Sequence, residues 1–179
     1  IKDYFGKDQY AVVNPSDNAV YPSNTAVNSD IKVKVIQKPL VTITGLVNNQ
    51  VYVMPGTQLI NIDDIKDYFN QDKYAVVNQN NAIYPSSTPV NSDIKVKVVQ
   101  KPLVTITGLV NNQVYVMPGT QLGSISDIKD YFGKNQYAVV NPSNNAVYPS
   151  NTAVNSAISV KVIQKPLVTI TGLVNNQVY

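Results

Sequence analysis

The chain has 179 residues and a formal net charge of +3, and it contains no Cys, His, Trp, Arg or Glu. Without imidazole and thiol groups it lacks the most common general bases, nucleophiles and zinc ligands, so we expect no enzyme, no catalytic residues, no cofactor and no metal site. Its lysines are mixed with aspartates, which argues against nucleic acid as a partner, and no apolar run reaches the length of about 20 residues that membrane insertion requires.

The first 38 residues favour strands separated by turns. Residues 1–5 correspond to the end of a short helix, and YAVV at residues 10–13 has the composition of a strand. Residues 19–21 predict a second, short strand, and residues 23–29 predict a loop. Residues 31–37 alternate apolar side chains with lysines, which indicates a strand with one buried and one solvated face.

The next segment predicts a hairpin followed by a second turn. Residues 40–47 and 50–54 would form the two strands, and Asn48-Asn49 would join them in a two-residue type I′ turn, because asparagine tolerates positive φ. Pro55-Gly56 places proline and glycine at positions i+1 and i+2 of a turn, which predicts type II.

A short amphipathic helix is predicted after the hairpin. Ile62, Ile65 and Phe69 are spaced at i, i+3 and i+7 and would form one apolar stripe. Asn61 followed by Asp64 has the spacing of a capping box, with aspartate in place of the usual glutamate or glutamine. About two turns of helix would need tertiary packing to persist.

An acidic cluster lies at the start of the predicted helix. Asp63, Asp64 and Asp67 could suggest calcium, but acidic side chains in a first turn also favour the helix dipole. Ser126 replaces Asp63 in the next copy, and the spacing of an EF-hand is missing. We therefore expect no metal ligands here.

Most of these elements occur more than once. The segment QKPLVTITGLVNNQVYVMPGTQL at residues 37–59 recurs letter for letter at residues 100–122, and it begins again at Gln164. Three prolines mark equivalent points 63 and 64 residues apart: Pro39, Pro102 and Pro166. This period is too long for one coil of a solenoid and suits a small domain with its own core.

We therefore predict tandem domains of about 63 residues. Residues 39–101 and 102–165 would be complete repeats, residues 1–38 the C-terminal part of a repeat, and residues 166–179 the N-terminal hairpin of a further repeat. The chain would thus be a fragment of a longer array.

The element order predicts an α+β, strand-rich fold of the β-grasp (ubiquitin-like) type. In that fold the first and last strands pair in parallel at the sheet centre. This would place Val41 and Ile43 beside the last strand of the repeat, which we call the closing strand, at residues equivalent to Val33. The alternative is an all-β immunoglobulin-like repeat, which normally has about seven strands in about 100 residues.

Two groups of residues are candidate contact positions. The repeats join with almost no linker, and proline restricts both its own φ and the preceding residue, so the junctions predict a stiff rod. The junction residues are Gln37, Lys38, Pro39, Gln100, Lys101, Pro102, Gln164, Lys165 and Pro166.

Exposed tyrosines can stack on sugars or pack on a partner, although strand tyrosines are more often half-buried. The candidate contact tyrosines are Tyr52, Tyr84, Tyr115 and Tyr148.

The stretch STPVNSDIKVKV at residues 87–98 resembles the end of the Listeria–Bacteroides repeat. The whole unit is similar to the β-grasp repeats of mucin-binding-protein type in the surface proteins of lactic acid bacteria. The resemblance implies an extracellular, cell-wall-attached adhesin of a Gram-positive bacterium. It implies no binding residues, because no ligand motif of either family is matched.

The architecture favours structural stalk repeats that project a distal binding domain, with neighbouring repeats of the same chain as partners. One alternative is a multivalent array that binds mucin, another host glycoprotein or a glycan. The other is a self-assembling extracellular fibre, in which the hairpin at residues 166–179 of one chain completes residues 1–38 of the next by head-to-tail self-association.

Overall fold

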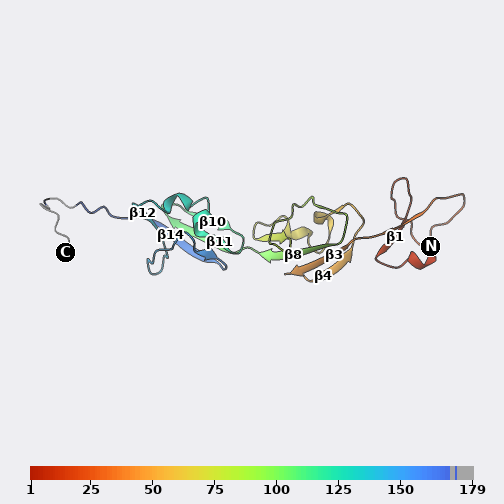
Figure 1. Ribbon diagram of the computed structural model, residues 1–179, viewed down its shortest axis with the longest axis horizontal. Helices are drawn as coiled ribbons and strands as arrows, with labels where there is room; N and C mark the ends of the chain where they lie inside the picture. The colour runs from red at the N-terminus through yellow and green to blue at the C-terminus, as the bar shows by residue number, and fades with distance from the viewer. Residues whose placement is uncertain (170–171, 173–179) are drawn as a thin grey trace. The chain divides into compact units, whose positions relative to one another are not determined.

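The structure, a computed structural model, describes residues 1–169 and residue 172. The chain divides into two compact units, Ile1–Gln100 and Lys101–Tyr179. The largest element of each unit is a four-stranded sheet (Figure 1). Strands dominate, and every helical segment in the described residues is a three-residue 3-10 helix. The prediction of a strand-rich fold with repeated units is therefore confirmed.

The sheet of the first unit has the strand order β4-β3-β8-β6. Its strands are β3 (Leu40–Gly45), β4 (Asn49–Tyr52), β6 (Tyr74–Val77) and β8 (Ile94–Gln100). β3 and β4 form an antiparallel hairpin, and β6 runs antiparallel to the other side of β8. The two strands at the centre, β3 and β8, are the first and last of the repeat.

This central pair is parallel, as the sequence predicts. Val41 lies opposite Ile94 and Ile43 lies opposite Val96. Val96 and Val98 are each 1% exposed, whereas the alternating Lys95 and Lys97 face solvent. The period-two pattern of the closing strand therefore separates a core face from a solvated face.

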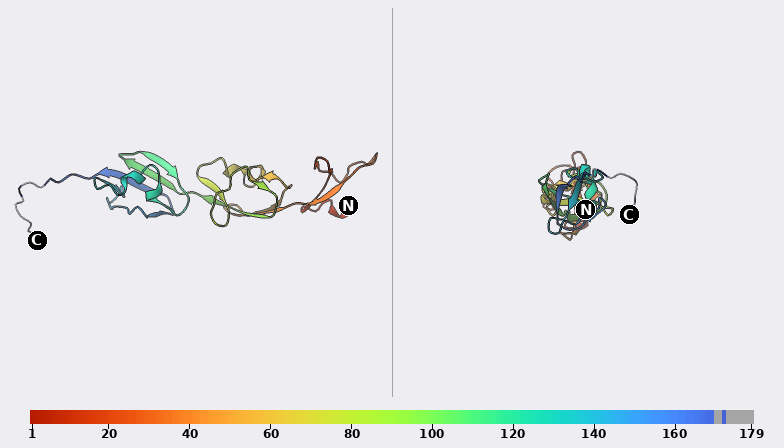
Figure 2. Two further views of the ribbon diagram at one scale, coloured as in Figure 1. Left: turned by 45° about the horizontal axis from the view of Figure 1, so that its top comes forward. Right: turned by 90° about the vertical axis from the view of Figure 1, so that its left-hand side faces the viewer.

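The second unit repeats this arrangement in the order β10-β9-β14-β12. Its strands are β9 (Leu103–Gly108), β10 (Asn112–Tyr115), β12 (Tyr137–Val140) and β14 (Ile158–Gln164). β9 and β14 are again the parallel central pair. Figure 2 shows the green hairpin strands and the blue closing strand of this unit side by side.

Each unit also has a two-stranded antiparallel pair formed by the connecting segments. In the first unit β5 (Thr57–Gln58) pairs with β7 (Pro89–Val90), and in the second β11 (Thr120–Gln121) pairs with β13 (Ala153–Val154). Val90 and Val154 are each 1% exposed. These short pairs hold the connection after the hairpin against the loop before the closing strand.

The predicted amphipathic helix is wrong. The segment forms two 3-10 helices, η2 (Leu59–Asn61) and η3 (Lys66–Tyr68), which are separated at Ile62 by extended backbone with φ −92° and ψ 115°. Leu59 N–H donates to Thr88 O and Ile60 N–H donates to Ser86 O, each at 3.0 Å, so the start of this segment is hydrogen-bonded to the neighbouring loop. The second unit has the equivalent η4 (Leu122–Ser124) and η5 (Lys129–Tyr131), and η1 (Lys2–Tyr4) begins the chain.

The apolar stripe nevertheless packs as expected. Ile62 and Ile65 are 3% and 0% exposed, and Phe69 packs against the same core. The capping-box prediction is wrong, because neither 3-10 helix has a side-chain cap. Asp64 instead accepts a hydrogen bond of 3.0 Å from Asn49 Nδ2 in the hairpin.

The hairpin turn also differs from the prediction. β3 ends at Gly45 and Ile43 lies opposite Asn49, so the connection is longer than two residues. Gly45 has φ +98°, whereas Asn48 and Asn49 do not adopt positive φ. A Cβ on Gly45 would lie 2.2 Å from Val98 O, so glycine is required where the turn leaves β3 against the closing strand.

The second predicted turn is confirmed. Gly56 has φ +89°, and Thr57 N–H donates to Met54 O at 3.0 Å across Pro55-Gly56. Both features match a type II turn with glycine at i+2.

Residues 1–38 form a smaller structure. β1 (Tyr10–Val13) pairs antiparallel with β2 (Lys34–Gln37), so the strand expected over residues 31–37 is shorter than predicted. The strand expected at residues 19–21 is reduced to an isolated bridge between Val13 and Val20.

Candidate functional site

The candidate acidic residues of the described part of the chain are not buried and make only local contacts. In residues 1–169 and 172, no polar or charged side chain is buried and no group of three or more acidic side chains could hold a metal ion. Asp63 accepts a hydrogen bond of 2.7 Å from Lys66 Nζ, which lowers the pKa of Asp63 and raises the pKa of Lys66. Asp64 does not share this contact, because its carboxylate accepts a hydrogen bond from Asn49 in the hairpin. The aspartates of the acidic cluster therefore have separate local partners.

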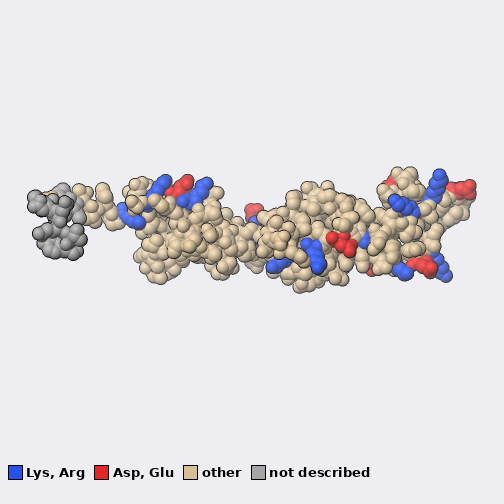
Figure 3. All heavy atoms as spheres, viewed as in Figure 1, with Lys and Arg blue, Asp and Glu red and all other residues tan. Residues whose placement is uncertain are grey.

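Charged side chains are spread thinly over the surface. On the face shown in Figure 3, most of the surface is uncharged and lysine lies beside aspartate in several places. This pattern offers no extended basic surface on that face for a polyanion. No helix in the described part of the chain has the length and apolar character needed to cross a membrane.

The first junction is bonded through its backbone on both sides. Only two residues, Lys38 and Pro39, separate β2 from β3. Lys38 N–H donates to Gln9 O at 2.8 Å, and Pro39 O accepts from Val53 N–H at 3.2 Å. The chain therefore passes from one sheet to the next with its polar backbone groups held on each side.

A side chain also fixes the start of β3. Leu40 N–H donates to Asp93 Oδ1 at 2.8 Å, which ties the opening strand to the loop before the closing strand. Ala157 occupies the equivalent position in the second unit, so this contact is not common to both repeats.

The other junction residues have matching local positions. The three glutamines each end a closing strand, with Gln37 opposite Tyr10, Gln100 opposite Tyr74 and Gln164 opposite Tyr137. Lys165 N–H donates to Gln136 O at 2.8 Å, as Lys38 does to Gln9, and Pro102 O accepts from Val116 N–H at 3.1 Å. Lys101 begins the second unit.

An open pocket of about 700 Å³ lies at the end of the second unit's closing strand. It is lined by Gln164, Lys165 and Pro166 together with Asn135, Gln136 and Leu167.

The candidate tyrosines fall into two groups. Tyr84 and Tyr148 are half-buried against the cores of their units, and their N–H groups donate to Val76 O and Val139 O at 2.9 Å. Tyr52 is half-buried at the end of β4, whereas Tyr115, at the equivalent position, is 37% exposed.

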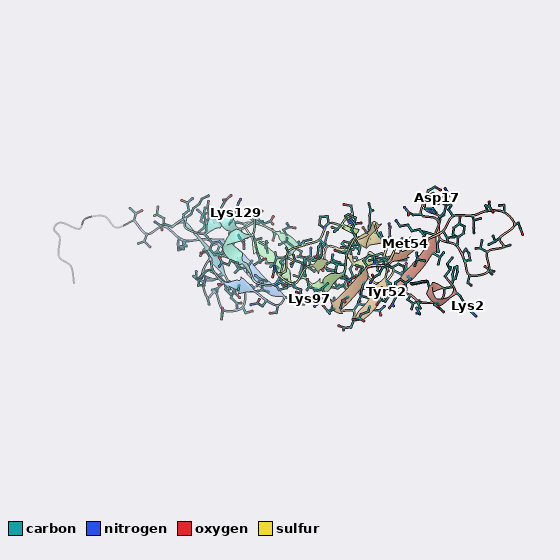
Figure 4. The ribbon with its side chains drawn as sticks, turned by 45° about the vertical axis from the view of Figure 1, so that its right-hand side comes forward. Lys2, Asp17, Tyr52, Met54, Lys97 and Lys129 are labelled. Carbon is teal, nitrogen blue, oxygen red and sulfur yellow. The ribbon has the colours of Figure 1, made fainter. Side chains whose placement is uncertain are left out.

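Tyr52 lines an open pocket of about 330 Å³ in the first unit. Its neighbours there include Tyr4, Tyr10, Lys38 and Met54. Figure 4 shows Tyr52 and Met54 at the side of the β3–β4 hairpin that adjoins residues 1–38. The pocket combines aromatic surface, a thioether and one ammonium group.

One aromatic feature was missed in the sequence. Tyr4 and Tyr10 pack edge to face with ring centroids 5.0 Å apart, and the equivalent pairs Tyr68–Tyr74 and Tyr131–Tyr137 are 5.0 and 5.2 Å apart. The repeated spacing of six residues between KDY and YAVV is the signal that could have revealed it. Each pair joins a 3-10 helix to the following strand.

Neither a protein family model nor a curated protein sequence matches this chain.

Proposed function

We propose that these are structural stalk repeats of a cell-surface adhesin of a Gram-positive bacterium, which hold a distal binding domain away from the cell wall. The observation that carries this proposal is the junction at Lys38 and Pro39, where two sheets are joined by two residues whose backbone groups are bonded to both sides. A short, bonded connection resists bending more than a free linker does, because fewer backbone dihedrals remain free. A stalk requires this property and needs no ligand site.

The repeats are, in this proposal, β-grasp-like domains in a rod attached outside the cell. The strand order β4-β3-β8-β6, with its parallel central pair, supports the β-grasp assignment. The 3-10 helices η2 and η3 would then stand where that fold has its helix.

Binding of purified 1–179 to immobilised mucin and to a glycan array tests this role. A stalk should give no saturable binding above that of a carrier protein of similar charge. Saturable binding that rises with the number of repeats would reject the stalk and favour a binding array.

A mucin- or glycan-binding array is the second candidate, and the pocket beside Tyr52 is the observation that favours it. Tyr52→Ala would then abolish binding. Tyr84→Phe provides the matched control, because it changes a tyrosine that packs against the core and keeps its ring.

A further inference from the structure

Each four-stranded sheet has one uncovered edge. β4 and β10 stand first in the strand orders of their sheets, and among the strands of the described residues each pairs with one neighbour, β3 or β9. At the opposite edge, isolated bridges from Val77 to Ile83 and from Val140 to Val147 partly cover β6 and β12. The uncovered edge of each sheet is therefore the second strand of its hairpin.

This edge directs backbone groups away from the sheet. Val53 N–H donates to Pro39 O at 3.2 Å, and bonded residues alternate along an antiparallel pair, so Gln50 and Tyr52 turn their backbone groups away from β3. A row of such groups is a template for an added strand. The segment Asn49–Tyr52 has no charged side chain, so two copies of it would not repel each other.

One side chain occupies the central donor of this edge. Gln50 N–H donates to Asn49 Oδ1 at 2.8 Å, and the same side-chain amide donates through Nδ2 to Asp64 Oδ1 at 3.0 Å. Asp64 lies in the connector after the hairpin and holds the amide so that its oxygen meets the Gln50 N–H. An added strand would have to break this hydrogen bond before it could pair there. We call Asn49 together with Asp64 the edge cap.

The second repeat has the same edge cap. Gln113 N–H donates to Asn112 Oδ1 at 2.8 Å, and Asn112 Nδ2 donates to Asp127 Oδ1 at 3.1 Å. The connector around it differs, because INIDD at residues 60–64 becomes GSISD at residues 123–127. Only a buried isoleucine and the aspartate of the edge cap are unchanged. The contact is thus retained where its neighbours in sequence have changed.

We propose that β4 and β10 are latent interfaces for the same strand of a second copy of this chain, and that the edge cap keeps them closed. Without the cap, β4 of one chain would add antiparallel to β4 of another and extend both sheets across the contact. The same surface is used on both sides, so the contact is isologous and closes as a dimer. The edge cap therefore keeps chains with many identical edges from joining through them.

Sedimentation of the full 179-residue chain across a concentration series tests the proposal. The wild-type chain should remain at 19.6 kDa, whereas Asn49→Ala should rise to twice that mass, because it frees the Gln50 N–H. Asn48→Ala is the matched control and should stay monomeric, because this neighbouring amide donates to Gly45 O within the turn. An Asn49→Ala chain that stays monomeric at all concentrations, or equal behaviour of the two variants, would overturn the proposal.

The equivalent edge of the second repeat should respond in the same way. Asn112→Ala alone should also form a dimer, because its amide covers the Gln113 N–H. Asn111→Ala, which removes the amide that donates to Gly108 O, is the control for this repeat. A dimer formed by Asn49→Ala but not by Asn112→Ala would contradict a cap that acts in both repeats.

Two adjacent aspartates separate the edge cap from a general loss of charge. Asp64→Ala removes the carboxylate that holds the Asn49 amide, so the chain should dimerise, with a higher dissociation constant than Asn49→Ala because the amide itself remains. Asp63→Ala breaks the ion pair with Lys66 and should leave the chain monomeric. Equal association of the Asp63 and Asp64 variants would contradict the assigned role of Asp64.

A rescue variant distinguishes strand pairing from aggregation of a destabilised chain. Gln50→Lys in the Asn49→Ala background places lysines on both edges that would meet, and their repulsion should restore the monomer. Circular dichroism of each variant checks that the repeats remain folded. A folded chain that stays associated after Gln50→Lys would contradict pairing through β4. These results do not depend on mucin or glycan binding, so the proposal and the stalk role can fail separately.

Discussion

At the scale of single residues, the hairpin turn depends on one glycine. Gly45 combines φ +98° with a position where a Cβ would lie 2.2 Å from Val98 O, and Gly108 does the same against Val162 O. Gly56 has φ +89° but nothing within 4 Å of its Cβ position. The two positions separate the cost of an unfavourable φ from the cost of a steric clash.

Gly45→Ala should therefore destabilise the first unit by more than the roughly 1–2 kcal/mol expected from left-handed backbone alone. Gly56→Ala should cost only about that amount. Urea unfolding can measure both, with the unchanged second unit as an internal reference. Equal losses of unfolding free energy in the two variants would show that the clash with Val98 O adds nothing to the cost of the positive φ.

A second residue-scale prediction concerns the pair Asp63 and Lys66. The hydrogen bond from Lys66 lowers the pKa of Asp63, so the stability from this pair is present above the unfolded-state pKa of Asp63 and is lost as the pH falls through its folded-state pKa. Both groups are solvent-exposed, so the effect on unfolding should be small.

Carboxyl chemical shifts measured by NMR across an acid titration test the pair directly. The pKa of Asp63 should be lower than that of an unpaired aspartate, and Lys66→Ala should raise it. If the substitution left the titration of Asp63 unchanged, the ion pair would not be the cause.

At the scale of elements, the core face of β3 should dominate the stability of a repeat. Ile43→Ala should cost about 2–5 kcal/mol, because Ile43 is 1% exposed at the centre of the sheet. Leu46→Ala removes an aliphatic side chain that is 49% exposed and should cost much less. Denaturant unfolding compares the two, and similar losses would contradict the assignment of the sheet centre.

The elements also show what the sequence could predict. The period-two alternation that predicts a strand over residues 31–37 recurs at residues 94–100, where the structure has a seven-residue strand with the expected buried face. At residues 31–37 only Lys34–Gln37 lie in a strand. The element order then placed β3 beside β8 in parallel. The spacing of Ile62 and Ile65 identified the buried side of their segment, but two separated 3-10 helices bury the same residues as one α-helix would.

The incorrect predictions concern positions where the structure is set by contacts between residues distant in sequence. The hairpin turn follows Gly45 rather than Asn48 and Asn49, because the chain there approaches Val98, 53 residues away. Asp64 binds Asn49 instead of capping a helix. The pocket beside Tyr52 is lined by residues from five separate segments, 4–6, 10–12, 20–21, 38 and 52–54, so no local pattern could have predicted it.

At the scale of the whole molecule, the stalk role depends on a fixed relation between successive repeats. The short junction at Lys38 and Pro39 and the near-identical repeats are the basis for expecting a uniform, stiff array. Strand exchange between identical neighbouring repeats is the accompanying hazard.

The distance between spin labels in the two complete repeats tests stiffness most directly. The chain has no cysteine, so Gln79→Cys and Ser143→Cys would place one label in the exposed turn after β6 and one in the exposed turn after β12. Labelled chains are compared with a variant that has a Gly-Ser linker inserted between Gln100 and Lys101. We predict a single narrow distance distribution that broadens with the linker. A broad distribution that the linker leaves unchanged would mean that the repeats move freely, which contradicts a stalk.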